Sequence, residues 1–220
     1  MWAYAEGAPD FFLFRLLRGI TCFIFLTLIY IAHGKKTNPL LGGFLFFYGL
    51  SSCATIWYEH NVIAIITMGL NCVAFLCLIR ALLPKVTLRK MSTFLIVSGV
   101  IMNLINGYLL YLFLNMIQTM TLSSAHFLFI ILNAMFLFLA AFCALLYNHT
   151  HSTRASLIFT TFMFLIVFCE VFRAIAYYDF AYGQIAVYAT RGLLILAVAF
   201  LTRYTFAPKI ESEQLNRRIF

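Results

Sequence analysis

Charged side chains are scarce in this chain. Only 10% of its 220 residues are Asp, Glu, Lys or Arg, whereas 64% are hydrophobic, and the mean hydropathy is +0.98. Water-soluble domains carry about 25% charged residues, because their surfaces must face water. The shortage excludes an ordinary soluble domain and predicts an integral membrane protein.

Long polar segments are also missing. Apolar runs of about 20 residues, the length that crosses a bilayer, follow one another with short breaks between them. We expect seven membrane spans, at residues 11–33, 39–58, 61–83, 92–116, 122–147, 155–178 and 184–206. Residues 1–10 then form a short outer tail and residues 207–220 a cytoplasmic tail. The sequence therefore predicts an all-α fold, a polytopic bundle of seven transmembrane helices.

Lysine and arginine are absent from every second break between these spans. The basic residues of the other breaks and of the C-terminal tail are Lys35, Lys36, Lys85, Arg89, Lys90, Arg154, Lys209, Arg217 and Arg218. The second and sixth breaks carry Glu59 and Asp179 instead. The positive-inside rule then predicts an outer N-terminus and a cytoplasmic C-terminus. This topology accounts for the net charge of +8, so we expect no nucleic-acid partner.

The sequence offers little for a cofactor or a metal. Its six cysteines fall inside expected spans, which predicts free thiols. His149 and His151 have a spacing that could serve a metal, but no third ligand follows, so we interpret them as part of a solvated loop. The spans contain no lysine, which excludes a retinal Schiff base. Glu170 is their only acid, whereas ion transporters usually have several. We expect neither metal nor cofactor.

The polar groups that do occur inside the spans gather at one depth. Counting 1.5 Å per residue from the expected helix ends places them in the outer half of the membrane. Charges in hydrocarbon cost about 2.5–3.5 kcal/mol each on insertion scales, so a chain that keeps them usually uses them. We predict an outward-facing polar cavity that binds a ligand through Arg18, Ser51, Ser52, Asn71, Asn106, Glu170, Arg173 and Arg191.

Several of these groups have a simpler interpretation. Ser and Asn in spans, Asn133 included, commonly join neighbouring helices by hydrogen bonds worth about 0.6 kcal/mol, and Arg15 could extend outward to the headgroups. The other arginines are harder to explain, because Glu170 is the only acid at their depth. Glu170 and Arg191 lie at matching depths on consecutive helices, which predicts a buried ion pair. The excess of arginine predicts an anionic ligand, for example a phosphate or carboxylate.

Three segments resemble the YhhN-like lysoplasmalogenase family. They are "NPLLGGFLFFYGLSSCATIWYEHN", "FMFLIVFCEVFRAIAYY" and "AVYATRGLLILAVAFL", and the likeness covers most of residues 39–206. Members of that family are small polytopic proteins, usually with eight helices, and characterised ones hydrolyse the vinyl-ether bond of lysoplasmalogens. The resemblance implies a related helical fold, a lipid-sized cavity and a place in the bacterial inner (cytoplasmic) membrane.

The chain departs from the acidic motifs of that family. Where the family has Gly-Asp, Ser-Asp and Ala-Gln, the pairs here are Ser51-Ser52, Cys169-Glu170 and Thr190-Arg191. Vinyl-ether hydrolysis that begins with protonation of the alkene needs a carboxylic acid that is held protonated. A neighbouring arginine favours the ionised form of Glu170 instead. The resemblance therefore implies the fold better than it implies the activity.

Three functions stay open at this point. The protein could bind an anionic amphiphile or a partner protein in its outer cavity without doing chemistry. It could be a divergent YhhN-like hydrolase, with Glu170 as the catalytic acid and Arg18 or Arg191 holding the phosphate. It could also be an accessory subunit of an envelope complex, in which a lipid face rich in its 25 Phe residues packs on partner spans. Membrane lipids are expected partners in each case.

Overall fold

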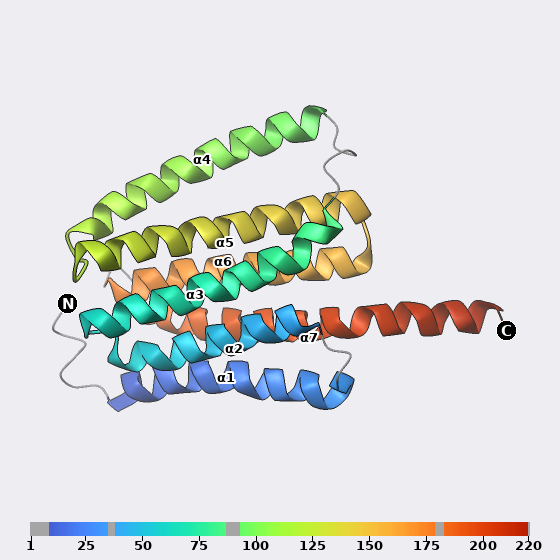
Figure 1. Ribbon diagram of the computed structural model, residues 1–220, viewed down its shortest axis with the longest axis horizontal. Helices are drawn as coiled ribbons and strands as arrows, with labels where there is room; N and C mark the ends of the chain where they lie inside the picture. The colour runs from blue at the N-terminus through green and yellow to red at the C-terminus, as the bar shows by residue number, and fades with distance from the viewer. Residues whose placement is uncertain (1–8, 35–37, 87–92, 179–182, 220) are drawn as a thin grey trace.

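Figure 1 shows the computed structural model, which describes residues 9–34, 38–86, 93–178 and 183–219. Over these residues the chain is helical and contains no strand. The helices are α1 (Pro9–His33), α2 (Pro39–Ala54), α3 (Asn61–Leu82), α4 (Thr93–Gln118), α5 (Ser124–His151), α6 (Arg154–Tyr177) and α7 (Gly183–Ile219). Two short 3₁₀ helices, η2 (Thr55–Trp57) and η3 (Leu83–Lys85), follow α2 and α3.

Six of these helices, α1, α2, α3, α5, α6 and α7, are long and apolar enough to cross a membrane. In α4 the described apolar segment, Gly107–Gln118, is shorter. The predicted all-α class and the positions of the helices along the chain are confirmed. Seven membrane crossings, with the N-terminus outside, stay a prediction.

Local signals set several helix boundaries. The Asn38 side chain accepts a hydrogen bond from the Leu40 backbone N–H at 3.0 Å, with Pro39 in the first turn of α2. Proline is well placed there, because the first N–H groups of a helix have no partner within the helix. Thr153 and Ser156 form a capping box at the start of α6, which satisfies two such donors.

Two boundaries differ from the sequence expectation. α5 continues through His149 and His151 and ends at Ser152, whose φ of 48° is left-handed. The two histidines therefore belong to the last turns of a helix and not to a loop. α7 continues to Ile219, beyond the expected end of the last span at residue 206. Pro208 lies within it, because proline removes one backbone hydrogen bond without forbidding helical dihedrals.

The helices run side by side along the long axis of the molecule (Figure 1). In space α1, α2, α3, α5, α6 and α7 follow one another around the bundle, and α7 packs back against α1. α4 lies at the edge, beside α5, and α7 projects beyond the other helices toward the C-terminus. Because the helices run side by side, residues that are far apart in the sequence lie close together at each end of the bundle.

Aromatic rings fill the centre of the bundle. Phe44 of α2 stacks on Tyr48 at 5.3 Å between ring centroids and meets Phe162 of α6 edge-on at 5.6 Å. All three side chains are fully buried. These contacts place the middle of α2 against α6, and so position Tyr48 for the site below. The six cysteines are free thiols, as predicted.

Glycine brings α1 close to α2. A Cβ on Gly19 would lie 2.2 Å from the Cys53 Sγ, and a Cβ on Gly49 would lie 3.1 Å from the Cys22 Cβ. Small residues allow membrane helices to approach closely and pack well. The approach carries Arg18, the residue before Gly19, into the centre of the bundle.

Candidate functional site

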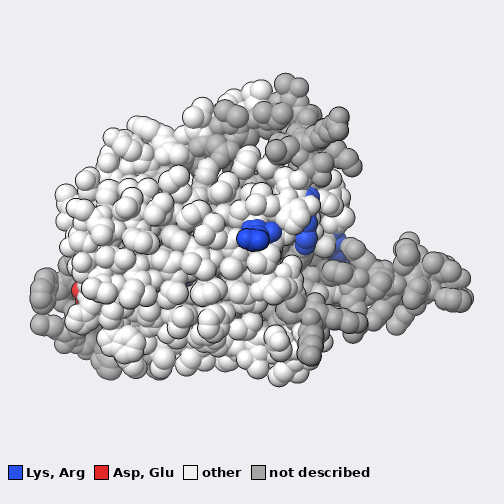
Figure 2. Space-filling model, in the orientation of Figure 1, with Lys and Arg blue, Asp and Glu red and all other residues white. Residues whose placement is uncertain are grey.

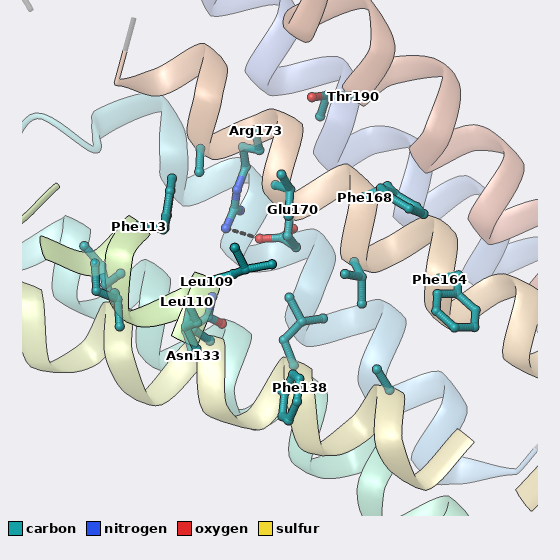
Figure 3. A pocket seen from close by; sticks show the side chains of 18 of the residues that line it. Leu109, Leu110, Phe113, Asn133, Phe138, Phe164, Phe168, Glu170, Arg173 and Thr190 are labelled. Atoms are coloured by element: carbon teal, nitrogen blue, oxygen red, sulfur yellow. Dashed lines mark ion pairs between the residues drawn. The ribbon is translucent and has the colours of Figure 1, made fainter. Parts of the chain in front are cut away.

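Glu170 of α6 is the centre of a buried charged cluster near the start of α1. Its carboxylate Oε1 accepts hydrogen bonds from Arg18 Nη2 at 2.9 Å and from the Tyr48 hydroxyl at 2.5 Å. Its Oε2 forms an ion pair with Arg173 Nη2, shown as the dashed line in Figure 3. Glu170 is 7% exposed, and both oxygens of its carboxylate contact donor groups.

The sequence explains how these side chains meet. Glu170 and Arg173 are three positions apart on α6 and so share a helix face. Arg18 reaches them from α1 because of the close approach at Gly19. Tyr48 links the two, since its hydroxyl accepts from Arg18 Nη2 at 2.6 Å while it donates to Glu170. The Arg18 guanidinium also lies over the Tyr48 ring, 5.4 Å from its centroid.

The expected ion pair between Glu170 and Arg191 is not the one that forms. Among the described residues, the ion pairs of Glu170 are with Arg18 and Arg173. The guanidinium of Arg191 lies over the ring of Tyr188 instead, 5.4 Å from its centroid. Counting residues gives the depth of a side chain but not its direction around the helix axis, which explains the error.

Arg15 is also placed differently from its expected outward extension. The residue is 7% exposed, and its Nη1 donates to the carbonyl oxygens of Thr55 at 2.5 Å and Ile56 at 3.2 Å. Its Nη2 pairs with the Glu59 carboxylate at 2.9 Å. Arg15 therefore satisfies carbonyl groups at the C-terminal end of α2, where a cation is favourable.

A cavity of about 1410 Å³ begins at this cluster and continues between α4, α5 and α6. Arg18, Glu170 and Arg173 line one end, and Asn148 and His149 lie at the other. The walls between them are mostly apolar and include Leu110, Phe113, Phe138, Phe142, Phe164 and Phe168, several of which appear in Figure 3. The volume exceeds the roughly 300–1,000 Å³ that is typical of sites for drug-sized molecules.

The eight residues predicted to bind a ligand divide into groups. Arg18, Glu170 and Arg173 line the cavity. Ser51, Ser52 and Asn71 are buried but are not among the described residues that line it, and Arg191 is not among them either. The side chain of Asn106 lies outside the described side chains. Ser51 donates to the Thr67 carbonyl oxygen at 2.9 Å, which is the helix-joining hydrogen bond of the simpler interpretation.

Tyr48 was not predicted as a site residue, and Asn133 was not among the residues predicted to line the cavity. Tyr48 lies one helical turn before Ser51 and Ser52, so its depth was a usable signal, but a tyrosine in an apolar span looks like a lipid-facing aromatic residue. Asn133 of α5 lines the cavity and is 7% exposed. Tyr58 was missed as well; its hydroxyl lies 2.8 Å from the Nε2 of the buried His126 at the same end of the cavity.

The charged end of the cavity has unmet hydrogen-bonding capacity. Arg18 Nε and Arg173 Nη1 are buried and have no hydrogen-bond partner among the described residues. The cluster of Arg18, Arg173 and Glu170 carries two positive charges and one negative charge. It can therefore accept one further anionic group, while the long apolar walls can accept a hydrocarbon chain.

Figure 2 shows one face of the molecule. The described residues on that face are mostly uncharged, with a few Lys and Arg side chains and an Asp or Glu at the left edge, as expected for a surface in contact with lipid. Comparison of the chain with family models, with curated proteins and with solved structures gave no match. The geometry of the site therefore carries the functional argument.

Proposed function

We propose that this protein is a membrane protein that binds an anionic amphiphile, with the charged group of the ligand at Arg18 and Arg173 and its hydrocarbon chain between α4, α5 and α6. One observation carries the proposal. A single cavity joins a buried cluster with an excess positive charge to a long apolar wall. Under the positive-inside rule this charged end faces the outside.

The charge of the cluster supports an anionic ligand. A buried guanidinium without enough acceptors is costly, because its desolvation is not repaid. Glu170 neutralises one of the two arginines that touch it, and the buried Arg18 Nε and Arg173 Nη1 lack partners among the described residues. A phosphate or carboxylate oxygen would supply both the charge and the acceptors, since such charge-assisted hydrogen bonds are the stronger kind.

The shape of the cavity supports a long chain. Asn133 and His149 both line it and are sixteen positions apart on α5, which corresponds to about 24 Å along the helix. Hydrocarbon gains little from moving out of a bilayer into an apolar cavity, because both environments are apolar. The walls therefore accommodate the chain, and the charged end determines which ligand is bound.

The hydrolase implied by the resemblance is the main alternative. A general acid must carry a proton that it can transfer. The Glu170 carboxylate accepts hydrogen bonds from Arg18 and Tyr48 and pairs with Arg173, an environment that favours its ionised form. This environment supports binding over vinyl-ether hydrolysis.

Binding can be tested by native mass spectrometry of the purified protein in mild detergent. We expect the protein to retain phosphatidylglycerol, which is anionic, in preference to diacylglycerol, which is not. Arg173→Gln removes one guanidinium of the cluster and should weaken phosphatidylglycerol binding about ten- to a hundredfold, since a hydrogen bond to a charged group is worth about 1.5–3 kcal/mol. Equal retention of the two lipids by the unmodified protein would contradict the proposal.

Arg80→Gln is the matched control. Arg80 is an exposed arginine near the end of α3 and is not among the described residues that line the cavity. The substitution Arg80→Gln removes one positive charge from the molecule, as Arg173→Gln does, but leaves the cluster of Arg18, Arg173 and Glu170 unchanged. If both variants weaken binding equally, the protein attracts lipid through its overall charge and not through this site.

A further inference from the structure

Asn133 presents a buried acceptor to the cavity. The residue is 7% exposed and lines the cavity. Its Oδ1 is buried and has no hydrogen-bond partner in the described part of the chain. Figure 3 shows Asn133 on α5 across the cavity from Glu170 and Arg173 of α6. The amide therefore lies at the charged end of the cavity, opposite the arginines.

Some buried polar groups at helix interfaces find a partner within the protein. The Thr160 hydroxyl of α6 donates to the Ala144 carbonyl oxygen of α5 at 2.9 Å, at the interface between the same two helices. Others do not: Ser52 Oγ, Thr67 Oγ1 and the Asn71 amide have no hydrogen-bond partner among the described residues, but none of these three residues is among the described residues that line the cavity. Leaving a buried acceptor unpaired destabilises a protein, whereas pairing it is mildly favourable. Asn133 differs from Ser52, Thr67 and Asn71 because it lines the cavity, and this position lets a ligand supply the missing donor.

The neighbours of Asn133 make its polar atom distinctive. Ile130 and Leu137, three and four positions away on α5, also line the cavity and share the helix face. From Ile130 to Leu146, the described residues of α5 that line the cavity are therefore apolar except for this one amide. A ligand atom that reaches the amide must be polar, or the amide stays unpaired.

We infer that the cavity selects an anionic amphiphile whose headgroup also donates a hydrogen bond through a free hydroxyl, and that Asn133 is the residue that accepts this bond. The inference rests on the proposed function and specifies its ligand. The unpartnered Arg173 Nη1 and Asn133 Oδ1 are complementary to an anionic phosphate oxygen and a hydroxyl on one headgroup. This combination is that of a phosphodiester esterified to glycerol or a similar polyol.

A hydroxyl fits the site better than an ammonium group. Arg18 and Arg173 exceed the single carboxylate of Glu170 in charge, and a third cation beside them would be repelled at low dielectric. A hydroxyl donates the same hydrogen bond without that cost. The expected headgroup therefore carries a net negative charge and is not zwitterionic.

The test compares two anionic lipids, one with free hydroxyls on its headgroup and one without. Phosphatidylglycerol and phosphatidylmethanol have the same phosphodiester charge and can have the same acyl chains, but a methyl group replaces glycerol in the second. Competition measured by native mass spectrometry should show about two- to tenfold tighter binding of phosphatidylglycerol, the ratio that one hydrogen bond produces. Phosphatidylethanolamine, added as a third lipid, should bind more weakly than phosphatidylglycerol.

Asn133→Leu should bind both anionic lipids and lose the preference between them. Asn115→Leu is the matched control, because Asn115 is an exposed asparagine of α4 that is not among the described residues that line the cavity; this variant should keep the preference. Asn133→Thr retains an acceptor oxygen and should keep part of it. The melting temperature of each variant in the same detergent reports whether it is folded.

The outcomes separate this inference from the proposed function. Equal binding of phosphatidylglycerol and phosphatidylmethanol by the unmodified protein would overturn the role of the hydroxyl and leave anionic binding intact. Tighter binding of phosphatidylethanolamine would show that the headgroup is zwitterionic. A preference that persists in folded Asn133→Leu would remove Asn133 from the site. Binding of none of the lipids would overturn both proposals, and this result does not depend on any variant.

Discussion

The two ends of the helix bundle use positive charge differently. At the end formed by η3, Lys85 donates to the Tyr204 hydroxyl at 2.7 Å and lies over the rings of Tyr147 and Tyr204, 5.5 and 5.4 Å from their centroids. This cation joins α3, α5 and α7. At the opposite end, Arg18 and Glu170 meet deep in the bundle, and buried donors stay without partners among the described residues.

The difference indicates which charges stabilise the fold and which prepare a site. An ammonium group held by aromatic faces and one hydroxyl near the end of a bundle is largely satisfied by the protein. An arginine pair around one carboxylate is not, because two positive charges share one negative charge. Variants at one end of the bundle can therefore be measured with the other end as the reference.

The largest effect is expected from Glu170→Gln. This change leaves Arg18 and Arg173 buried without their carboxylate, which typically costs about 3–5 kcal/mol. The melting temperature in detergent should fall markedly. Arg18→Met alone should lower it less, because Glu170 keeps Arg173 as its partner. The double variant should recover part of the loss from Glu170→Gln, because one of the two buried arginines is then also removed.

A second double variant identifies the partner. Glu170→Gln combined with Arg191→Met should show simple additivity, because residues that do not interact add independently. Recovery in that variant, and not in the one with Arg18→Met, would restore the pairing expected from depth alone. Glu59→Gln serves as a control at the half-exposed pair with Arg15 and should change stability by about 1 kcal/mol or less.

A smaller effect is expected at the other end of the bundle. Lys85→Met should lower stability by about 1–2 kcal/mol, since it removes cation–π contacts and one hydrogen bond, and it should leave phosphatidylglycerol binding unchanged. Tyr204→Phe removes the hydroxyl alone and should lower the melting temperature less. If Lys85→Met weakened lipid binding as strongly as Arg173→Gln, the two ends would not have separate roles.

Much of the fold could be predicted from the sequence because hydropathy and helix caps are local. The length of each apolar run marks a helix, and Asn38 with Pro39 marks the start of α2. The end of α5 was missed because "NHTH" is polar enough to look like a loop, although polar residues are ordinary in the last turn of a helix at the membrane boundary.

The sequence predicts how deep each polar side chain of the candidate site lies in the bundle, but not the direction in which it points around its helix axis. The polar layer correctly placed Arg18, Glu170 and Arg173 near one another. Rotation about the helix axis depends on packing between helices, which no single segment encodes. For this reason Arg191 was expected at Glu170, and the hydroxyl of Tyr48 was not expected there. The position of α4 at the edge of the bundle also depends on packing and could not be read from its apolar sequence.

The close approach of α1 and α2 has a consequence for how the site tolerates change. The Arg18–Glu170 contact depends on residue 19 having no side chain. A methyl group there would have the Cys53 backbone nitrogen and the Gly49 carbonyl oxygen at 3.2 Å, besides the Cys53 Sγ at 2.2 Å. The sulfur can rotate away, but the two backbone atoms can yield only if the helices separate. The charged end of the cavity is thus sensitive to an added carbon on an apolar helix face as well as to the loss of a charge.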